Sequence, residues 1–236
     1  LSSLIYLLPH SQIFLYYILL TSPCFGADRQ TFNKGDLDSM PFPDPADLCH
    51  NDKVFIKKLA HLLEEGSEKP WKEIDALFAR LYGLNEADCE LMEDTLFSTA
   101  FYRTKGAAAF HPPMPGDVKI FTDCLQETLQ PFLAITGRTV RVRPADFPQD
   151  VYRDSWYFVE ATASGQCVSV TPGLLEQAIA IANDLGASRV VVRAQDSQAG
   201  LLLGQIAQRR WWTKTRARLC ATHIIHNHLD ALRPYR

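Results

Sequence analysis

The sequence lacks the cysteine spacings of a metal knuckle or a disulfide framework. No CxxC pair occurs, and the six cysteines lie about 25 to 55 residues apart. Scattered cysteines are typical of small buried side chains in a reducing compartment, so we expect a cytoplasmic protein. The cysteines are Cys24, Cys49, Cys89, Cys124, Cys167 and Cys220.

The N-terminus lacks charge, since no formally charged side chain occurs between Leu1 and Ala27. A secretory signal needs a basic region before its apolar stretch, and none is present. Ile13–Leu20 is strongly apolar but too short to span a bilayer, and Pro9 and Pro23 bracket it. We predict one buried helix over 11–20 and no membrane contact, with a membrane segment as the alternative. Because the chain begins with Leu, we also expect a fragment or an alternative start codon.

Motifs for nucleotide or cofactor binding are missing as well. There is no GxGxxG and no GK(S/T), so phosphates have no obvious glycine-rich cradle. A methyltransferase that uses S-adenosylmethionine would also need an Asn/Asp-Pro-Pro segment followed by an aromatic residue. The one double proline, Pro112-Pro113, lies between His111 and Met114. We therefore expect no catalytic residue and no cofactor site in this chain.

Two nuclease patterns come close without matching. Asp154 and Glu160 suggest a PD…ExK site, but the lysine is missing. His226-Asn227-His228 resembles HNH in letters only, because contiguous helical residues point in different directions. His223 and His226 share a helix face, yet two histidines without a third ligand do not make a zinc site. We expect no metal, and keep a divergent metal nuclease as the weakest alternative.

The order of patterns predicts an α+β fold, with a helical N-terminal half followed by a small mixed β-sheet domain with two helices. Its composition of 47% hydrophobic and 22% charged residues is that of a globular protein. We predict three parts: 1–48; 49–110, a helical unit; and 111–236, a small α/β domain.

Caps and apolar spacing predict the individual elements. Helices are expected from Asn51 to Gly66 with Val54, Phe55, Leu59, Leu62 and Leu63 inward, over 71–82, from Asn85, and from Asp117. Strands are expected over 139–143, 156–161, 189–193 and 200–212. Helices over 172–185 and from Thr213 to Leu232 complete a β-β-α-β-β-α order, with both helices on one face of the sheet.

The last part of the chain is basic. From Ala199 onward there are seven basic residues and one acid, a net charge of +6, so the preceding 198 residues carry −9. Within it, QIAQRRWWTKTRAR interleaves arginines with two tryptophans, as in segments that hold phosphates and stack on bases. The predicted DNA-binding residues are Arg209, Arg210, Trp211, Trp212, Thr213, Lys214, Arg216 and Arg218. The alternative is one tryptophan in the core and arginines paired with acidic residues.

Three segments resemble the C-terminal part of type IIG-like and phage-defence N6-adenine DNA methyltransferases. The N-terminal stretch through Asp36, Leu37 and Pro41-Phe42-Pro43 resembles the closing part of their target-recognition region. The resemblance implies that residues 1–48 are the end of a target-recognition-like region. Ala76–Leu96, with Tyr82-Gly83-Leu84, Glu90, Glu93 and Asp94, is similar to the helical stretch that follows. Gln208–Thr213 and Ala217 resemble the ending of some members.

The resemblance covers about half of the chain and implies a DNA-recognition or accessory region without catalysis. The catalytic core that would bind S-adenosylmethionine is absent from these residues. The implied partners are duplex DNA and the methyltransferase catalytic domain of a bacterial restriction–modification or defence system. The alternative is a protein-interaction module that docks a partner through Trp211 and Trp212.

Overall fold

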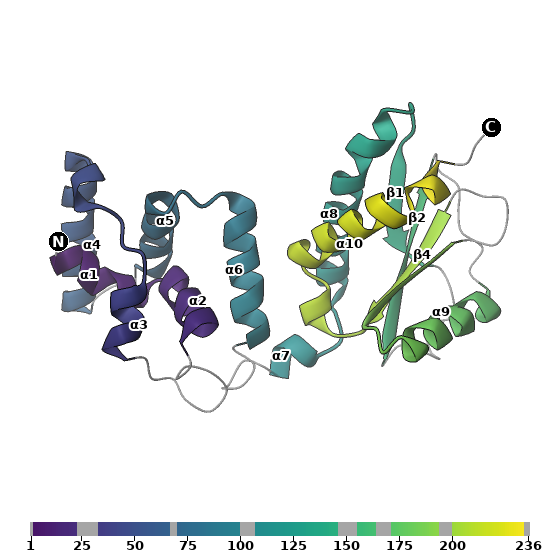
Figure 1. The fold of residues 1–236 in the computed structure, drawn as a ribbon, viewed down its shortest axis with the longest axis horizontal. Helices are drawn as coiled ribbons and strands as arrows, with labels where there is room; N and C mark the ends of the chain where they lie inside the picture. Colours follow the sequence, from purple (N-terminus) through teal and green to yellow (C-terminus); the bar gives the residue numbers. More distant parts are fainter. Residues whose placement is uncertain are drawn as a thin grey trace. The chain divides into compact units, whose positions relative to one another are not determined.

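The computed structural model describes residues 2–22, 33–66, 70–99, 107–145, 155–163, 171–193 and 200–233. The chain forms two compact units, Leu1–Gly106 and Ala107–Arg236, and each is described by itself (Figure 1). The first is helical and the second contains a four-stranded sheet, which confirms the predicted α+β fold. Residues on both sides of the predicted boundary at 48/49 belong to one core, because Leu48 packs in the same cluster as Ile56 and Leu59.

The first unit is a set of short helices around one apolar core. Leu7, Ile18, Leu59, Ile74 and Phe78 are almost completely buried in it. The helices are α1 (Ser2–Leu7), α2 (Gln12–Thr21), α3 (Lys34–Ser39), α4 (His50–Glu65), α5 (Trp71–Leu81) and α6 (Glu86–Thr99), with 3-10 turns η1 (Leu8–His10) and η2 (Pro45–Asp47).

The apolar N-terminal run forms helix α2, as predicted. The Ser11 hydroxyl caps it by accepting a hydrogen bond from the Phe14 N–H, and Phe14 and Ile18 face the core. Among the described helices, none is by itself long and apolar enough to cross a membrane. Only Ser2–His10 and Gln12–Thr21 taken together are long and apolar enough among the described residues. The chain is bent by 71° between these two segments.

Helix α4 differs from its prediction at its start and in its buried face. Its cap is Cys49 rather than Asn51, because the Cys49 sulfur accepts the Asp52 N–H while the Asp52 carboxylate accepts the Cys49 N–H. Val54 and Phe55, predicted inward, are exposed. The helix meets the core through Ile56, Leu59 and Ala60 instead, a face rotated away from Val54. Its predicted end is confirmed, since Gly66 adopts a φ of 65°.

The second unit has a sheet of four antiparallel strands in the order β1-β2-β4-β3. Strands predicted over 139–143, 156–161 and 189–193 are confirmed within three residues at each end. The predicted fourth strand ends early, at Ile206, and a 3-10 turn follows. The strands are β1 (Val140–Pro144), β2 (Trp156–Ala163), β3 (Arg189–Arg193) and β4 (Gly200–Ile206). The other elements are α7 (Ala107–Phe110), α8 (Pro115–Ala134), α9 (Pro172–Asp184), η5 (Arg209–Trp211), α10 (Lys214–Asn227) and η6 (Leu229–Leu232).

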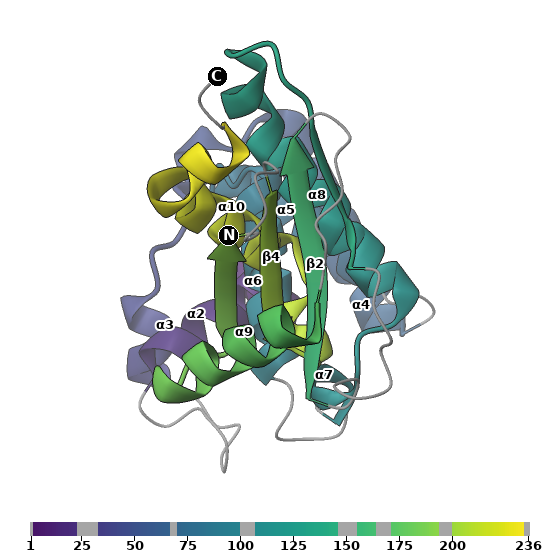
Figure 2. The same cartoon turned by 90° about the vertical axis from the view of Figure 1, so that its right-hand side faces the viewer.

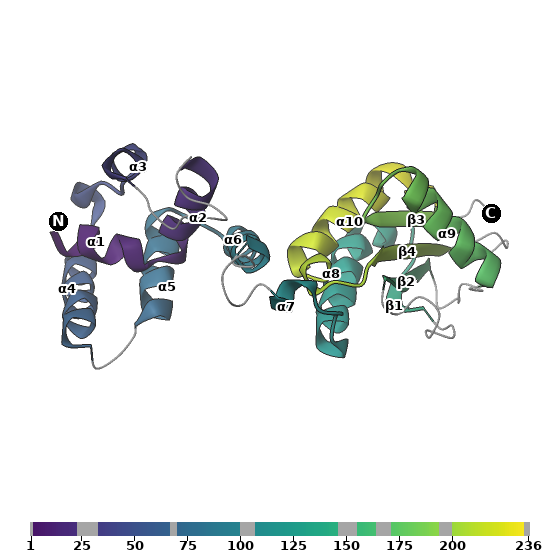
Figure 3. The same ribbon diagram turned by 90° about the horizontal axis from the view of Figure 1, so that it is seen from below.

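Helices cover both faces of this sheet, which corrects the prediction of two helices on one face of a mixed sheet. α8 and α10 pack on one face and α9 on the other (Figures 2 and 3). β2 and β3 run parallel to each other, and β4 lies antiparallel between them, so every pairing in the sheet is antiparallel. β2 sends Val159 and Ala161 toward α8 and α10, and Trp156 and Phe158 toward α9.

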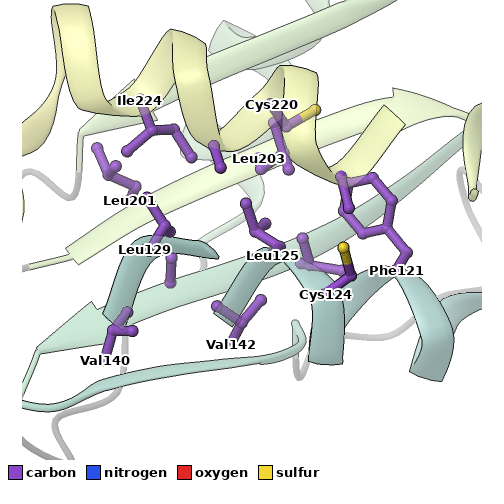
Figure 4. Packing of buried hydrophobic residues seen from close by; sticks show 14 of the residues in the cluster. Phe121, Cys124, Leu125, Leu129, Val140, Val142, Leu201, Leu203, Cys220 and Ile224 are labelled. Carbon is purple, nitrogen blue, oxygen red and sulfur yellow. The ribbon is translucent and has the colours of Figure 1, made fainter. Parts of the chain in front are cut away.

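The larger core of the second unit lies between the sheet and the pair α8–α10. Phe121, Leu125 and Leu129 of α8 meet Leu201 and Leu203 of β4 (Figure 4). α10 completes this layer with Ala217, Cys220 and Ile224. This packing fixes the start of α10 and the turn before it, where the predicted DNA-binding residues lie.

Candidate nucleic-acid interface

The eight predicted DNA-binding residues lie in η5 and the first turns of α10. The chain leaves β4 at Ile206, turns through η5 and enters α10 at Thr213. The Thr213 hydroxyl oxygen accepts the Arg216 N–H at 3.3 Å, so Thr213 is the N-cap, as predicted. The Arg209 N–H donates to the His111 carbonyl at 2.9 Å, which ties this turn to the segment before α8.

Trp212 is part of the core. Its side chain is 2% exposed and packs against Phe121 and Tyr157, with ring centroids at 4.9 and 5.1 Å. Its indole N–H donates to the Ile206 carbonyl at 3.1 Å. A buried ring whose polar atom is satisfied holds the turn in place. Trp212 therefore positions its neighbours, and Trp211 is the tryptophan that lies nearer the surface.

Arg209 is joined to an acidic residue of α8. Its Nε lies 2.9 Å from Asp117 Oδ2 and its second guanidinium nitrogen 3.3 Å from Oδ1, a bidentate pair. Asp117 also accepts the Met114 N–H at the start of α8. Both charged side chains are largely buried, at 28% and 18% exposure. Arg209 therefore acts as a tether between α8 and η5.

Two further arginines, Arg210 and Arg216, lie over aromatic rings. The Arg210 guanidinium lies 4.0 Å from the centroid of Phe110 and 5.7 Å from that of Trp211. Arg216 lies 4.3 Å from the Trp211 centroid, and the Gln208 amide oxygen accepts the Arg210 Nε–H at 2.9 Å. Both arginine residues are half-exposed, and the central carbon of each guanidinium group lies over an aromatic ring. An aromatic ring restrains the guanidinium group above it, and a restrained planar guanidinium is suited to contact phosphate oxygens.

Lys214 and Arg218 extend this basic surface along α10. Lys214 is exposed and Arg218 is half-exposed. Lys214 is also in the first turn of a 14-residue helix, where the helix dipole favours anions. We define the basic stack as Arg210, Trp211, Lys214, Arg216 and Arg218. Phe110 and Gln208 contact Arg210 of the basic stack, and neither was predicted as a site residue. Phe110 lies far from Arg210 in sequence and meets it only through the fold.

The acidic and histidine residues that the sequence suggested as metal ligands form no metal site among the described residues. Glu160 is buried and paired with Arg143, and Asp154 lies outside the described residues. His223 lies beside His228, with ring centroids at 5.2 Å, a neighbour that its helix spacing did not indicate. The chain bends after Asn227, at the end of α10, which brings His228 back toward His223.

Comparison with known proteins gives no relative. No protein-family model matches the chain, and neither a curated protein nor a solved structure matches it.

Proposed function

We propose that this chain is the DNA-recognition and accessory region of an adenine-specific DNA methyltransferase, acting in bacterial restriction–modification or phage defence. It binds duplex DNA through the basic stack and does not itself catalyse methylation. The catalytic domain that it serves supplies the S-adenosylmethionine site. The cysteine usage supports a cytoplasmic setting.

The observation that carries the proposal is the placement of the Arg210 guanidinium over the ring of Phe110 and of the Arg216 guanidinium over the ring of Trp211. Guanidinium groups held by aromatic rings lose less side-chain entropy when they bind phosphate, so they make effective backbone contacts. The second unit as a whole has 14 basic and 11 acidic residues, a net charge of +3, whereas the first has −6. The basic stack therefore lies in the unit whose charge favours DNA.

Contacts of this type position a protein on DNA without reading its sequence. We therefore expect affinity for an arbitrary duplex that falls steeply with salt, with a log–log slope of about −0.9 for each phosphate contact. Fluorescence anisotropy of a short labelled duplex, titrated at several salt concentrations, measures this slope.

Replacing Arg210 and Arg216 by Gln tests the assignment to the basic stack. The double variant should bind all duplexes less tightly and flatten the slope by about 2, as expected for the loss of two phosphate contacts. Arg209 is left intact because its loss would break the tether to Asp117. Arg141→Gln is the matched control, since Arg141 is exposed on β1 of the same unit. An unchanged slope in the double variant would contradict the proposal.

The second candidate is a protein-interaction module anchored by Trp211. The Trp211 side chain is half-exposed, so part of its ring is accessible to a partner as an anchor. Trp212 no longer supports this alternative because it is buried in the core. This candidate predicts no affinity for DNA at low salt, and the same titration distinguishes it.

A further inference from the structure

A hollow of about 480 Å³ opens beside the basic stack, between the end of α9 and the turn that follows β4. Its lining includes Phe110, Trp156, Asn183 and Gln208. Pro112 and Ser155 also line it, and both are exposed. The volume falls within the range of small-ligand sites in proteins.

The lining suits a flat heterocycle with apolar faces and polar edges. Phe110 and Trp156 provide aromatic surface, while Asn183 and Gln208 provide amide groups that can pair with the edge of a base. The Gln208 amide is already oriented, because its oxygen accepts from Arg210 Nε. Its NH₂ group is thereby left as the donor to a ligand. Polar and apolar groups share the lining, which favours a heterocycle over a purely apolar ligand.

Two residues that line the hollow also contact Arg210 of the basic stack. Phe110 lines the hollow and carries the Arg210 guanidinium 4.0 Å from its ring centroid, and Gln208 lines the hollow and bonds to Arg210. A base in the hollow would therefore have its own sugar–phosphate close to Arg210. A free apolar molecule would have no phosphate for Arg210, and a base that stays paired in a duplex would not enter the hollow.

We propose that this hollow binds one unpaired nucleobase of the DNA whose backbone is held by Arg210 and Arg216. The inference rests on the proposed function and deepens it. The chain would recognise duplex DNA most tightly where one base is out of the stack. A protein that stacks and hydrogen-bonds a single base gains discrimination for locally opened DNA without any change in its phosphate contacts.

The test compares three duplexes of equal length: one fully paired, one with a single unpaired adenine, and one with an abasic residue in place of that adenine. The full chain should bind the unpaired adenine about tenfold more tightly than either of the others. The abasic duplex controls for bending at the bulge, because it keeps the backbone and lacks only the base.

Asn183→Trp should abolish the preference by filling the hollow, while the salt slope on the paired duplex stays the same. Leu185→Trp is the matched control, because Leu185 is 74% exposed just after α9 and does not line the hollow. The control should keep the tenfold preference. Both positions are exposed, and circular dichroism checks that the variants fold.

Equal binding of all three duplexes, with a steep salt slope, would overturn this inference and leave the proposed function standing. Retention of the preference by Asn183→Trp would also overturn it. If no duplex binds at low salt, the proposed function fails and the inference falls with it. The three-duplex comparison uses the unmodified chain, so it decides even if a variant does not fold.

Discussion

The His223–His228 pair makes the stability of the second unit depend on pH. Burial lowers the pKa of His223, and nearby Arg189 lowers it further. Burial also lowers the pKa of His228, together with His223 and Arg193, while Asp230 opposes the shift. Because both folded-state pKa values lie below the ordinary 6.5, the unfolded chain takes up protons first on acidification. Stability is therefore fully present above pH 6.5 and is lost as the pH falls through the lowered pKa values.

We expect a lower free energy of unfolding at pH 5.5 than at pH 7.5, measured by urea denaturation. Replacing His223 and His228 together by Asn should reduce this difference. His226→Asn is the matched control, since His226 is exposed on the same helix, and it should keep the full difference. If the double variant shows the same loss of stability as the control, these two side chains are not its source.

Two adjacent tryptophans show what sequence reasoning could and could not find at the level of residues. The segment around Trp211 and Trp212 was identified from its basic and aromatic composition, and Thr213 from its capping chemistry. Which tryptophan would be buried depends on the turn geometry of η5, which directs Trp212 toward Phe121. Likewise, the pairing of Arg209 with Asp117 joins residues 92 positions apart, which no local pattern indicates.

At the scale of elements, Gly204 lets β4 pack between its two neighbours. It pairs with Phe158 of β2 and Val190 of β3. A Cβ at this position would lie 2.5 Å from Phe158 Cε1 and 3.1 Å from Val190 Cγ1. We expect Gly204→Ala to lower the free energy of unfolding by about 1–3 kcal/mol, the usual cost of overpacking. Urea denaturation at pH 7.5 measures it.

Gly116→Ala is the control for that prediction, because nothing lies within 4 Å of a Cβ built at Gly116 in the first turn of α8. It should be neutral or slightly stabilising. Adding Phe158→Leu to Gly204→Ala should cost less than the sum of the two single changes, since the smaller side chain relieves the contact. Full additivity would mean that the clash with Phe158 does not cause the loss.

Elements with strong local signals were predicted well from sequence, and elements defined by tertiary contacts were not. A run of three β-branched valines placed β3, and glycine at a left-handed position placed the end of α5, where Gly83 has a φ of 67°. The cap of α4 was missed because cysteine is not among the usual N-cap residues. The side of the sheet that α9 covers was missed because β2 is buried on both faces, so its sequence has no alternation to read.

At the scale of the whole molecule, each unit has its own core and its own charge. The buried clusters of residues 1–106 and 107–236 share no residue. The first unit has a net charge of −6 and the second +3. Independent cores predict that each unit folds alone, and the opposite charges predict that only the second attracts DNA.

We therefore expect residues 107–236, produced alone, to unfold cooperatively in urea and to bind the paired duplex with the salt slope of the full chain. Phosphate contacts set that slope, and all of the basic stack lies in this fragment. Residues 1–106 alone should show no binding at the same salt concentrations. The slope is the decisive quantity, because removing the acidic unit can raise the affinity through weaker repulsion while the number of contacts stays constant. A flatter slope for the fragment would place part of the DNA contact in the first unit, and the basic stack would then be only one portion of the interface.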